Sequence, residues 1–138
     1  MTGNLPPILN QPPSSIPFRY AATIEVSLEA AHQLHLPYHS PCNRKHGHSY
    51  RIRVVIAATG LDANGMIVDF TKVKVVIRQY DHQDLNESFT PTTVEKFGEI
   101  LLDSLQTLVQ RENPHATVTE IAISETGSTW MSIQYETR

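Results

Sequence analysis

Apolar and polar residues alternate along two stretches in the first half of the chain, and a period of two is typical of a half-buried strand. In the first stretch, residues 20–32, the even-numbered positions are apolar, and residues 46–59 repeat the alternation. The apolar positions are Ile24, Val26, Leu28 and Ala30 in the first stretch, and Tyr50, Ile52, Val54 and Ile56 in the second. We therefore predict one strand over Tyr20–His32 and another over His46–Thr59.

The middle of the chain changes to a helical period. Asp69 fits an N-cap, and the valines, isoleucine and tyrosine at 73, 76, 77 and 80 follow it at helical spacing. Further on, Thr92 to Glu95 fits a capping box behind Pro91. The apolar stripe of the second helix comprises Val94, Phe97, Leu101, Leu105 and Leu108, and it stops before Pro114. We therefore predict two helices joined by a loop over residues 81–90.

Two further strands, Ala116–Glu125 and Thr129–Tyr135, are predicted near the end of the chain, with Gly127 in the connection between them. Strands at both ends with helices between them favour an α+β fold, in which an antiparallel sheet carries the helices on one face. The second face and the edge strands of such a sheet need cover, and an oligomer is one common way to provide it.

The length of 138 residues and the composition indicate a single domain. A net charge of −3 gives no general attraction to nucleic acid or anionic membranes, and no apolar run approaches the ~20 residues of a membrane span. Residues 1–17 contain five prolines and lack a secretory signal pattern. We interpret them as a flexible arm ahead of a single domain, 18–138, or alternatively as an arm that docks on a neighbouring subunit. One cysteine and no export signal indicate the cytoplasm.

Three of the seven histidines fall at the ends of the predicted apolar strand faces. His32 shares the parity of the apolar positions in the first strand, and His46 and His48 share that of the second. If the strands pair antiparallel, the end of the first lies beside the start of the second, and the imidazoles meet. Three neutral imidazoles form an open zinc site, with a fourth position for water or substrate. The alternative is that each is an ordinary core histidine with satisfied hydrogen bonds.

Cys42 is the only cysteine, and it lies four residues before His46. It allows two interpretations: a fourth zinc ligand in a closed structural site, or a base or nucleophile beside an open one. Arg44, Lys45 and a divalent cation would each favour the thiolate. The position of Cys42 alone does not choose between them.

Asp81, His82 and Glu125 are further candidates. A carboxylate next to an imidazole can tune a general acid/base, although a helix-end histidine with a solvated aspartate fits these residues equally well. Glu125 ends an apolar strand face, where a carboxylate is costly unless it has a partner. A ligand that offers two parallel N–H donors would suit it, and the alternative is a side chain turned out to water.

These motifs occur together in one known family. From about Tyr20 to Tyr135 the chain resembles the 6-pyruvoyl-tetrahydropterin synthase / 6-carboxy-tetrahydropterin synthase family. The segments that carry the resemblance are Ala30-Ala31-His32, Cys42-x-x-x-His46-Gly47-His48, Gly65-Met66-Ile67-Val68-Asp69-Phe70, Asp81-His82-x-x-Leu85-Asn86-Glu87, Pro91-Thr92-Thr93 and Ser124-Glu125-Thr126. The three-residue gap between Cys42 and His46 is similar to the bacterial branch that makes 6-carboxy-tetrahydropterin for queuosine and related deazapurines.

The resemblance implies the tunnelling fold, in which four antiparallel strands and two helices assemble into trimers that form a strand barrel. Two trimers would stack as a homohexamer. It also implies a Zn²⁺ ion on His32, His46 and His48.

The resemblance further implies a role for each remaining candidate. Cys42 would be a catalytic base rather than a ligand, and Asp81 with His82 would be the partnering acid/base pair, reaching the site from a neighbouring subunit. Glu125 would bind the amino-pyrimidine edge of a pterin. Thr93 would be a further pterin contact, although the next residue is valine where the family more often has glutamate.

The expected activity is that of a zinc-dependent lyase. It would convert 7,8-dihydroneopterin triphosphate to 6-carboxy-5,6,7,8-tetrahydropterin with loss of triphosphate and acetaldehyde. Two alternatives remain: a 6-pyruvoyl-tetrahydropterin synthase, and a non-catalytic zinc-binding assembly module.

Overall fold

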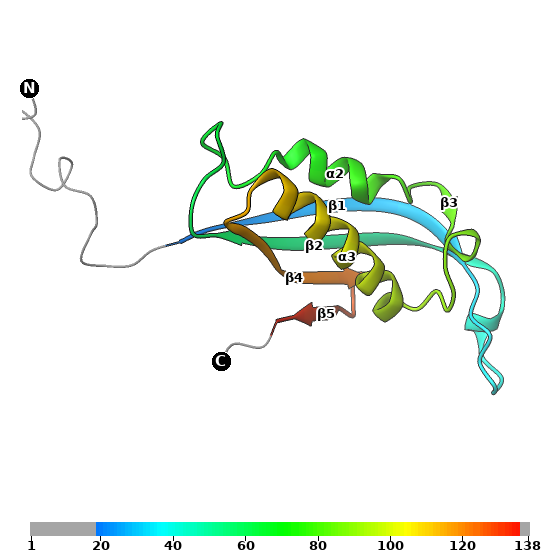
Figure 1. Ribbon diagram of the computed structural model, residues 1–138. Coiled ribbons are helices and arrows are strands. Elements are labelled where there is room, and N and C mark those ends of the chain that lie inside the picture. The colour runs from blue at the N-terminus through cyan, green and yellow to red at the C-terminus, as the bar shows by residue number, and fades with distance from the viewer. Residues whose placement is uncertain (1–18, 136–138) are drawn as a thin grey trace, which may run out of the picture.

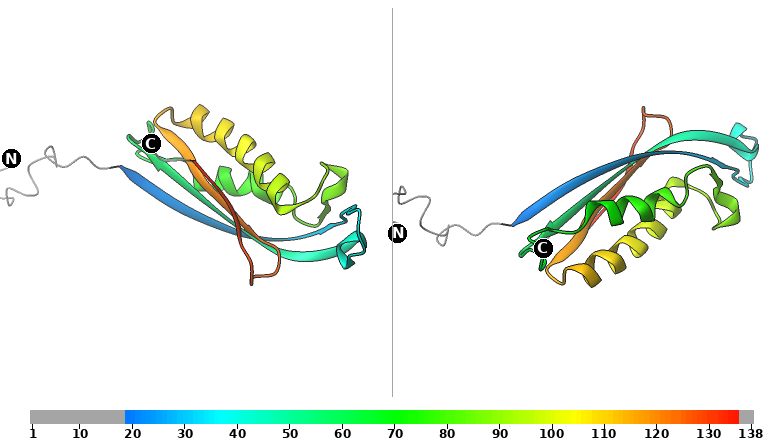
Figure 2. Two further views of the ribbon diagram at one scale, coloured as in Figure 1. Left: turned by 90° about the horizontal axis from the view of Figure 1, so that it is seen from below. Right: turned by 90° about the horizontal axis from the view of Figure 1, so that it is seen from above.

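The computed structural model describes residues 19–135, so the predicted N-terminal arm lies outside the described residues. A five-stranded sheet has the order β3-β1-β2-β4-β5, and both helices lie against one of its faces (Figures 1 and 2). The elements are β1 (Tyr20–His32), η1 (Pro41–Asn43), β2 (His46–Ala58), α2 (Phe70–Arg78), β3 (Gln83–Asp84), η2 (Leu85–Glu87), α3 (Val94–Glu112), β4 (Ala116–Ser124) and β5 (Met131–Gln134). The predicted α+β class is confirmed.

The four predicted strands form the antiparallel part of the sheet, and one strand was not predicted. β3 has only two residues and pairs parallel with Ala30 and Ala31 of β1. Two residues are too short to show a period, so the sequence pattern contains no signal for this strand. Its consequence is structural, because it attaches the loop that follows α2 to the edge of β1.

The helices begin at side-chain caps. The Asp69 carboxylate accepts the Thr71 N–H at 2.9 Å, as predicted for the N-cap of α2. At α3 the predicted capping box is wrong by one residue: Thr93 is the N-cap, and its hydroxyl accepts the Lys96 N–H at 3.1 Å. Thr92 is buried and makes different contacts, described below.

The core lies between the helices and the apolar faces of the strands. Leu28 and Ile52 from the sheet, and Phe97, Leu101 and Leu105 from α3, are almost completely buried. Burial of a large apolar side chain stabilises a fold by roughly 1.5–3 kcal/mol, so this layer fixes the helices against the sheet. β1 and β2 pair without interruption over their whole length, from Tyr20 opposite Ala58 to His32 opposite His46.

The opposite face of the sheet is polar. The Glu25 carboxylate bridges Arg51 and Arg53 at 2.9 Å each, and both guanidinium groups lie over the Trp130 ring, at 5.3 and 4.6 Å from its centroid. The two arginines lower the pKa of Glu25. This face is therefore not an apolar surface that must be covered. The sheet edges are the remaining reason to expect an oligomer. In the described residues, β1 pairs with β3 only at Ala30 and Ala31.

Neither α2 nor α3 is long and apolar enough to cross a membrane, and this holds for the described residues as a whole.

Candidate metal centre

Three imidazoles meet where β1 ends and β2 begins. The register places His32 opposite His46, and Ala30 opposite His48. The ring centroids are 4.5 Å apart for His32 and His46, 5.0 Å for His32 and His48, and 4.7 Å for His46 and His48. One nitrogen from each ring lies within 4.8 Å of the others. The convergence predicted from strand parity is confirmed.

His32 is the buried member of the group, with 1% of its surface exposed. Its Nδ1 lies 2.8 Å from the carbonyl oxygen of Thr92. A carbonyl can only accept, so Nδ1 carries the proton and Nε2 has a free lone pair. This Nε2 is buried and has no hydrogen-bond partner among the described residues. A buried acceptor without a partner is costly, and a metal ion would satisfy it.

His46 has a similar ring contact, and the surroundings of His48 change its pKa. Nδ1 of His46 lies 2.6 Å from the Arg44 carbonyl, which leaves its Nε2 as the lone-pair nitrogen. Burial lowers the pKa of His48, and His32 and His46 lower it further against an opposing effect of the Glu125 carboxylate. Imidazoles whose second nitrogen donates to a carbonyl are typical zinc ligands, and His32 and His46 have this arrangement, so the donor set fits that ion.

Glu125 faces the histidines rather than open water. It directly follows β4, and its carboxylate oxygens lie 3.8 Å from Nε2 of His32 and 3.7 Å from Nε2 of His48. Its side chain remains 29% exposed. It also lines a cavity of about 200 Å³ between the start of α3 and the β4–β5 connection, so it borders both the histidines and space for a ligand.

Tyr50 contacts two of these imidazoles, those of His32 and His48. The sequence pattern predicted it only as a core residue. Its ring centroid lies 5.5 Å from that of His48, and its buried hydroxyl has no partner among the described residues. Burial, and then the Glu125 charge, raise the pKa of Tyr50. The hydroxyl therefore stays protonated beside the imidazoles.

Cys42 lies in η1, in the loop that leads into β2, and is half-buried. Its carbonyl accepts the Leu34 N–H at 2.9 Å, and its N–H donates to the Ser40 hydroxyl at 3.2 Å. Among the described residues, the group able to hold a metal consists of the three histidines without Cys42. The geometry thus favours an open site over a closed one with a sulfur ligand.

Asp81 and His82 directly precede β3, at the edge of the sheet where β3 pairs with β1. Asp81 Oδ1 accepts the Glu29 N–H at 2.8 Å, and its other oxygen lies 3.7 Å from Nε2 of His82. His82 is the one non-glycine residue with positive φ in the described chain, at 59°, and its side chain is 78% exposed. The two side chains therefore do lie close together, which their adjacency in sequence did not guarantee.

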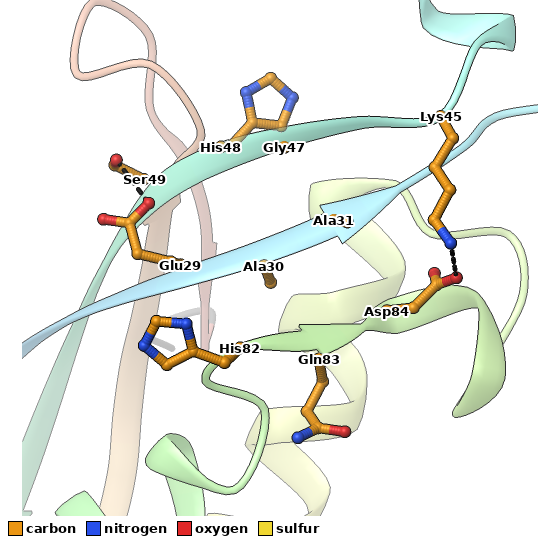
Figure 3. A pocket seen from close by; sticks show the side chains of 10 residues that line it. All are labelled: Glu29, Ala30, Ala31, Lys45, Gly47, His48, Ser49, His82, Gln83 and Asp84. Atoms are coloured by element: carbon orange, nitrogen blue, oxygen red, sulfur yellow. Dashed lines mark hydrogen bonds and ion pairs between the residues drawn. The ribbon is translucent and has the colours of Figure 1, made fainter.

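A groove of about 450 Å³ runs along this edge and is lined by His48, His82 and residues of β1 and β3. Figure 3 shows His48 and His82 on opposite sides of β1, with rings that do not point toward each other. A 2.7 Å ion pair between Lys45 and Asp84 borders the groove. Within one chain, the structure thus brings His82 to the groove but not to the three-histidine group.

Thr93 caps α3, as described above. Two neighbours of the site, Asn86 and Thr92, were given no role at the site by sequence reasoning, which predicted Thr92 only as part of a capping box. They lie in motifs that carry the family resemblance, but their hydrogen bonds reach residues 53 to 60 positions away, which no periodicity signals.

Comparisons with known proteins agree on the relationship. A family model described as 6-pyruvoyl tetrahydropterin synthase matches residues 21–136. The 6-carboxy-5,6,7,8-tetrahydropterin synthase of Bacillus subtilis is 23% identical over 128 residues, covering 86% of this chain and 88% of the relative. The enzyme of the same name from Synechocystis is 43% identical over 74 residues, or 46% of this chain and 56% of the relative.

Solved structures show the same fold. The 6-pyruvoyl tetrahydropterin synthase of Caenorhabditis elegans superposes with a TM-score of 0.68 at 23% identity, covering 86% of this chain and 96% of that one. A Plasmodium vivax 6-pyruvoyltetrahydropterin synthase superposes with a TM-score of 0.64 at 17% identity, covering 87% and 99%. On the match of the family model over most of the chain, this protein belongs to the 6-pyruvoyl tetrahydropterin synthase family.

Proposed function

We propose that this chain is a zinc-dependent lyase that converts 7,8-dihydroneopterin triphosphate and one water molecule to 6-carboxy-5,6,7,8-tetrahydropterin, triphosphate and acetaldehyde. The observation that carries the proposal is the group of three imidazoles with the unpartnered, buried Nε2 of His32. The bacterial relatives named as 6-carboxy-tetrahydropterin synthases support the choice of product.

His32, His46 and His48 would hold the ion through one nitrogen each. A bound Zn²⁺ would supply Lewis-acid polarisation of substrate oxygens and so acidify the neighbouring C–H bond. The protein's own part is to orient the three imidazoles and to leave a ligand position open, and the lowered pKa of His48 favours its neutral form.

Glu125 would orient the substrate. Its carboxylate, next to the cavity at the start of α3, would accept two parallel N–H bonds from the amino-pyrimidine edge of the pterin. Its carboxylate oxygens also lie 3.8 and 3.7 Å from Nε2 of His32 and His48, so the pterin would bind next to the three imidazoles. Thr93, at the N-cap of the same helix, would be a further pterin contact.

Proton transfer would be divided between two groups. The Cys42 thiolate would remove the proton from the substrate side chain, and His82, held by Asp81, would return or relay one. Because the ring of His82 does not point toward His48 of its own chain (Figure 3) and His82 is not part of the three-histidine group, we assign it to the site of a neighbouring subunit. A homohexamer built from two barrel-forming trimers would provide that neighbour, joined through the sheet edges. The single cysteine suits a reducing compartment, so we place the enzyme in the cytoplasm, in queuosine or another deazapurine pathway.

Product analysis with the purified zinc-loaded protein tests the proposal. Incubation with 7,8-dihydroneopterin triphosphate should yield acetaldehyde and 6-carboxy-tetrahydropterin in equal amounts. Formation of 6-pyruvoyl-tetrahydropterin without acetaldehyde would instead assign the 6-pyruvoyl activity. Zinc binding without any turnover would assign a non-catalytic assembly module.

The role of Cys42 is tested separately with Cys42→Ala. Removal of a catalytic base should lower kcat by about 10²–10⁴-fold while the bound zinc per chain stays unchanged. A variant with wild-type kcat would exclude the thiol as the base, and one that loses zinc would make Cys42 a ligand.

A further inference from the structure

Asn86 in η2 is bound to the main chain just beyond the end of β1. Its Oδ1 accepts the Gln33 N–H at 2.8 Å, and its Nδ2 donates to the Gln33 carbonyl at 2.9 Å. A neighbouring strand would make the same pair of bonds, so one side chain replaces strand pairing at the residue after His32. Both ends of that pairing are half-buried, where loss of a partner is costly.

Thr92 connects this amide to the imidazole. Its hydroxyl lies 3.1 Å from the Gln33 carbonyl and 3.4 Å from Asn86 Oδ1, so it can donate to either oxygen. Its own carbonyl accepts the Nδ1–H of His32 at 2.8 Å. Thr92 and His32 are both buried. Thr92 therefore contacts both the backbone after His32, through its hydroxyl, and the ring of His32, through its carbonyl.

This arrangement determines which nitrogen of His32 faces the other histidines. Because the Thr92 carbonyl fixes the proton on Nδ1, the lone pair must lie on Nε2, which is buried among the imidazoles without a partner. If Gln33 or Thr92 moved, the ring would lose the acceptor that fixes its tautomer and orientation. Removal of such an outer partner typically lowers metal affinity by about 10–100-fold.

We propose that Asn86 is a positioning residue of the metal centre: through Gln33 and Thr92 it fixes the tautomer and orientation of His32. The inference rests on the proposed metal-binding function, and it adds a residue from a separate loop to the three ligands. Asn86 itself makes no bond to an imidazole in the described chain; it acts only through these two neighbours.

The test uses the full chain and Zn²⁺ alone. Zinc affinity is measured by competition with a chromophoric chelator for the wild type and for Asn86→Ala. The variant should bind zinc about 10–100-fold more weakly. Nitrogen-15 NMR of the metal-free proteins gives a second readout: His32 should be a pure Nδ1–H tautomer in the wild type and a mixture in the variant.

Asn113 provides a matched control. It too is an asparagine whose side chain holds main-chain groups: fully buried at the other end of the sheet, it donates to the carbonyls of Gly60 and Ile67 at 3.0 Å each. Asn113→Ala should lower thermal stability and leave zinc affinity unchanged. Thr92→Val, which removes only the hydroxyl, should weaken zinc binding less than Asn86→Ala, and it replaces that variant as the test if Asn86→Ala does not fold.

The outcomes separate the inference from the function on which it rests. A wild type that binds no zinc overturns both. A wild type that binds zinc with an Asn86 variant of equal affinity and unchanged His32 tautomer overturns the inference alone. Equal losses of affinity in the Asn86 and Asn113 variants would mark a general loss of stability, and would also overturn it.

Discussion

His32 and His82 lie beside the same edge of the sheet and are held in opposite ways. His32 ends β1 with 1% of its surface exposed, and hydrogen bonds fix its ring and the next residue. His82 precedes β3, with a side chain that is 78% exposed and a backbone in the left-handed region. A metal ligand must keep one lone pair in one place, whereas a proton carrier must be reached by substrate. The difference in burial therefore fits the roles proposed for the two histidines.

The largest effect should come from removing the fixed member. His32→Ala takes away one of three ligands, and a third of a binding free energy of roughly 10–16 kcal/mol corresponds to about 10³-fold weaker zinc binding. The zinc dissociation constant from chelator competition checks this. His115→Ala, at an exposed histidine outside the group, is the control and should bind zinc as the wild type does. Unchanged affinity in His32→Ala would remove the metal centre from this location.

The exposed member should affect turnover and not the metal. His82→Ala should lower kcat by about 10²–10⁴-fold with full zinc content, because a positioned acid/base contributes that much to proton transfer. Asp81→Asn should cost less, since the amide oxygen can still accept the Glu29 N–H. Steady-state kinetics with zinc analysis on the same samples separates the two readouts. Loss of zinc in His82→Ala would show that His82 also affects metal binding, against the separate roles proposed for His32 and His82.

The backbone at His82 gives a smaller effect, on stability. A non-glycine residue with φ near 60° costs roughly 1–2 kcal/mol relative to its preferred conformations, and glycine avoids that cost. His82→Gly should therefore be more stable than His82→Ala by about 1 kcal/mol, although both lack the imidazole. Denaturant unfolding of the two variants makes the comparison. Equal stabilities would mean that the backbone of this loop relaxes without the side chain.

The smallest effect is expected at the ion pair that borders the groove. Lys45 lowers the pKa of Asp84, and Asp84 raises that of Lys45, through their 2.7 Å contact. Because the folded pKa of Asp84 lies below 3.8, its contribution is complete above pH 3.8 and is lost as the pH falls through the folded value. Because the folded pKa of Lys45 lies above 10.5, its contribution is lost only as the pH rises through that value.

Lys45→Met should therefore be slightly less stable than the wild type at neutral pH, and the difference should vanish in strong acid. Unfolding curves at several pH values check the sign. Lys96→Met, at an exposed 3.9 Å pair with Glu99, is the control and should show a smaller difference at every pH. If the stability difference between Lys45→Met and the wild type grew in acid, the predicted pH dependence of the ion pair would be wrong.

The strands and the histidine group could be predicted from the sequence, because both follow from the alternation of apolar and polar residues. β1 has the predicted ends, β2 ends one residue early, and the three histidines meet because alternation fixes which side of a strand each residue occupies. The Asn86 and Thr92 contacts could not be predicted in this way. They depend on the path of an irregular loop, and the cap of α3 shifted from Thr92 to Thr93 for the same reason.

The uninterrupted pairing of β1 with β2 has a consequence for folding. A slip by one residue would move His46 and His48 to the face that carries Glu25 and Arg51, leaving His32 alone. Only the native register then offers three nitrogens, and a ligand that binds one state alone stabilises that state by mass action. Zinc present during folding would thus select against misregistered sheets, and zinc depletion would raise the fraction of chains trapped in them.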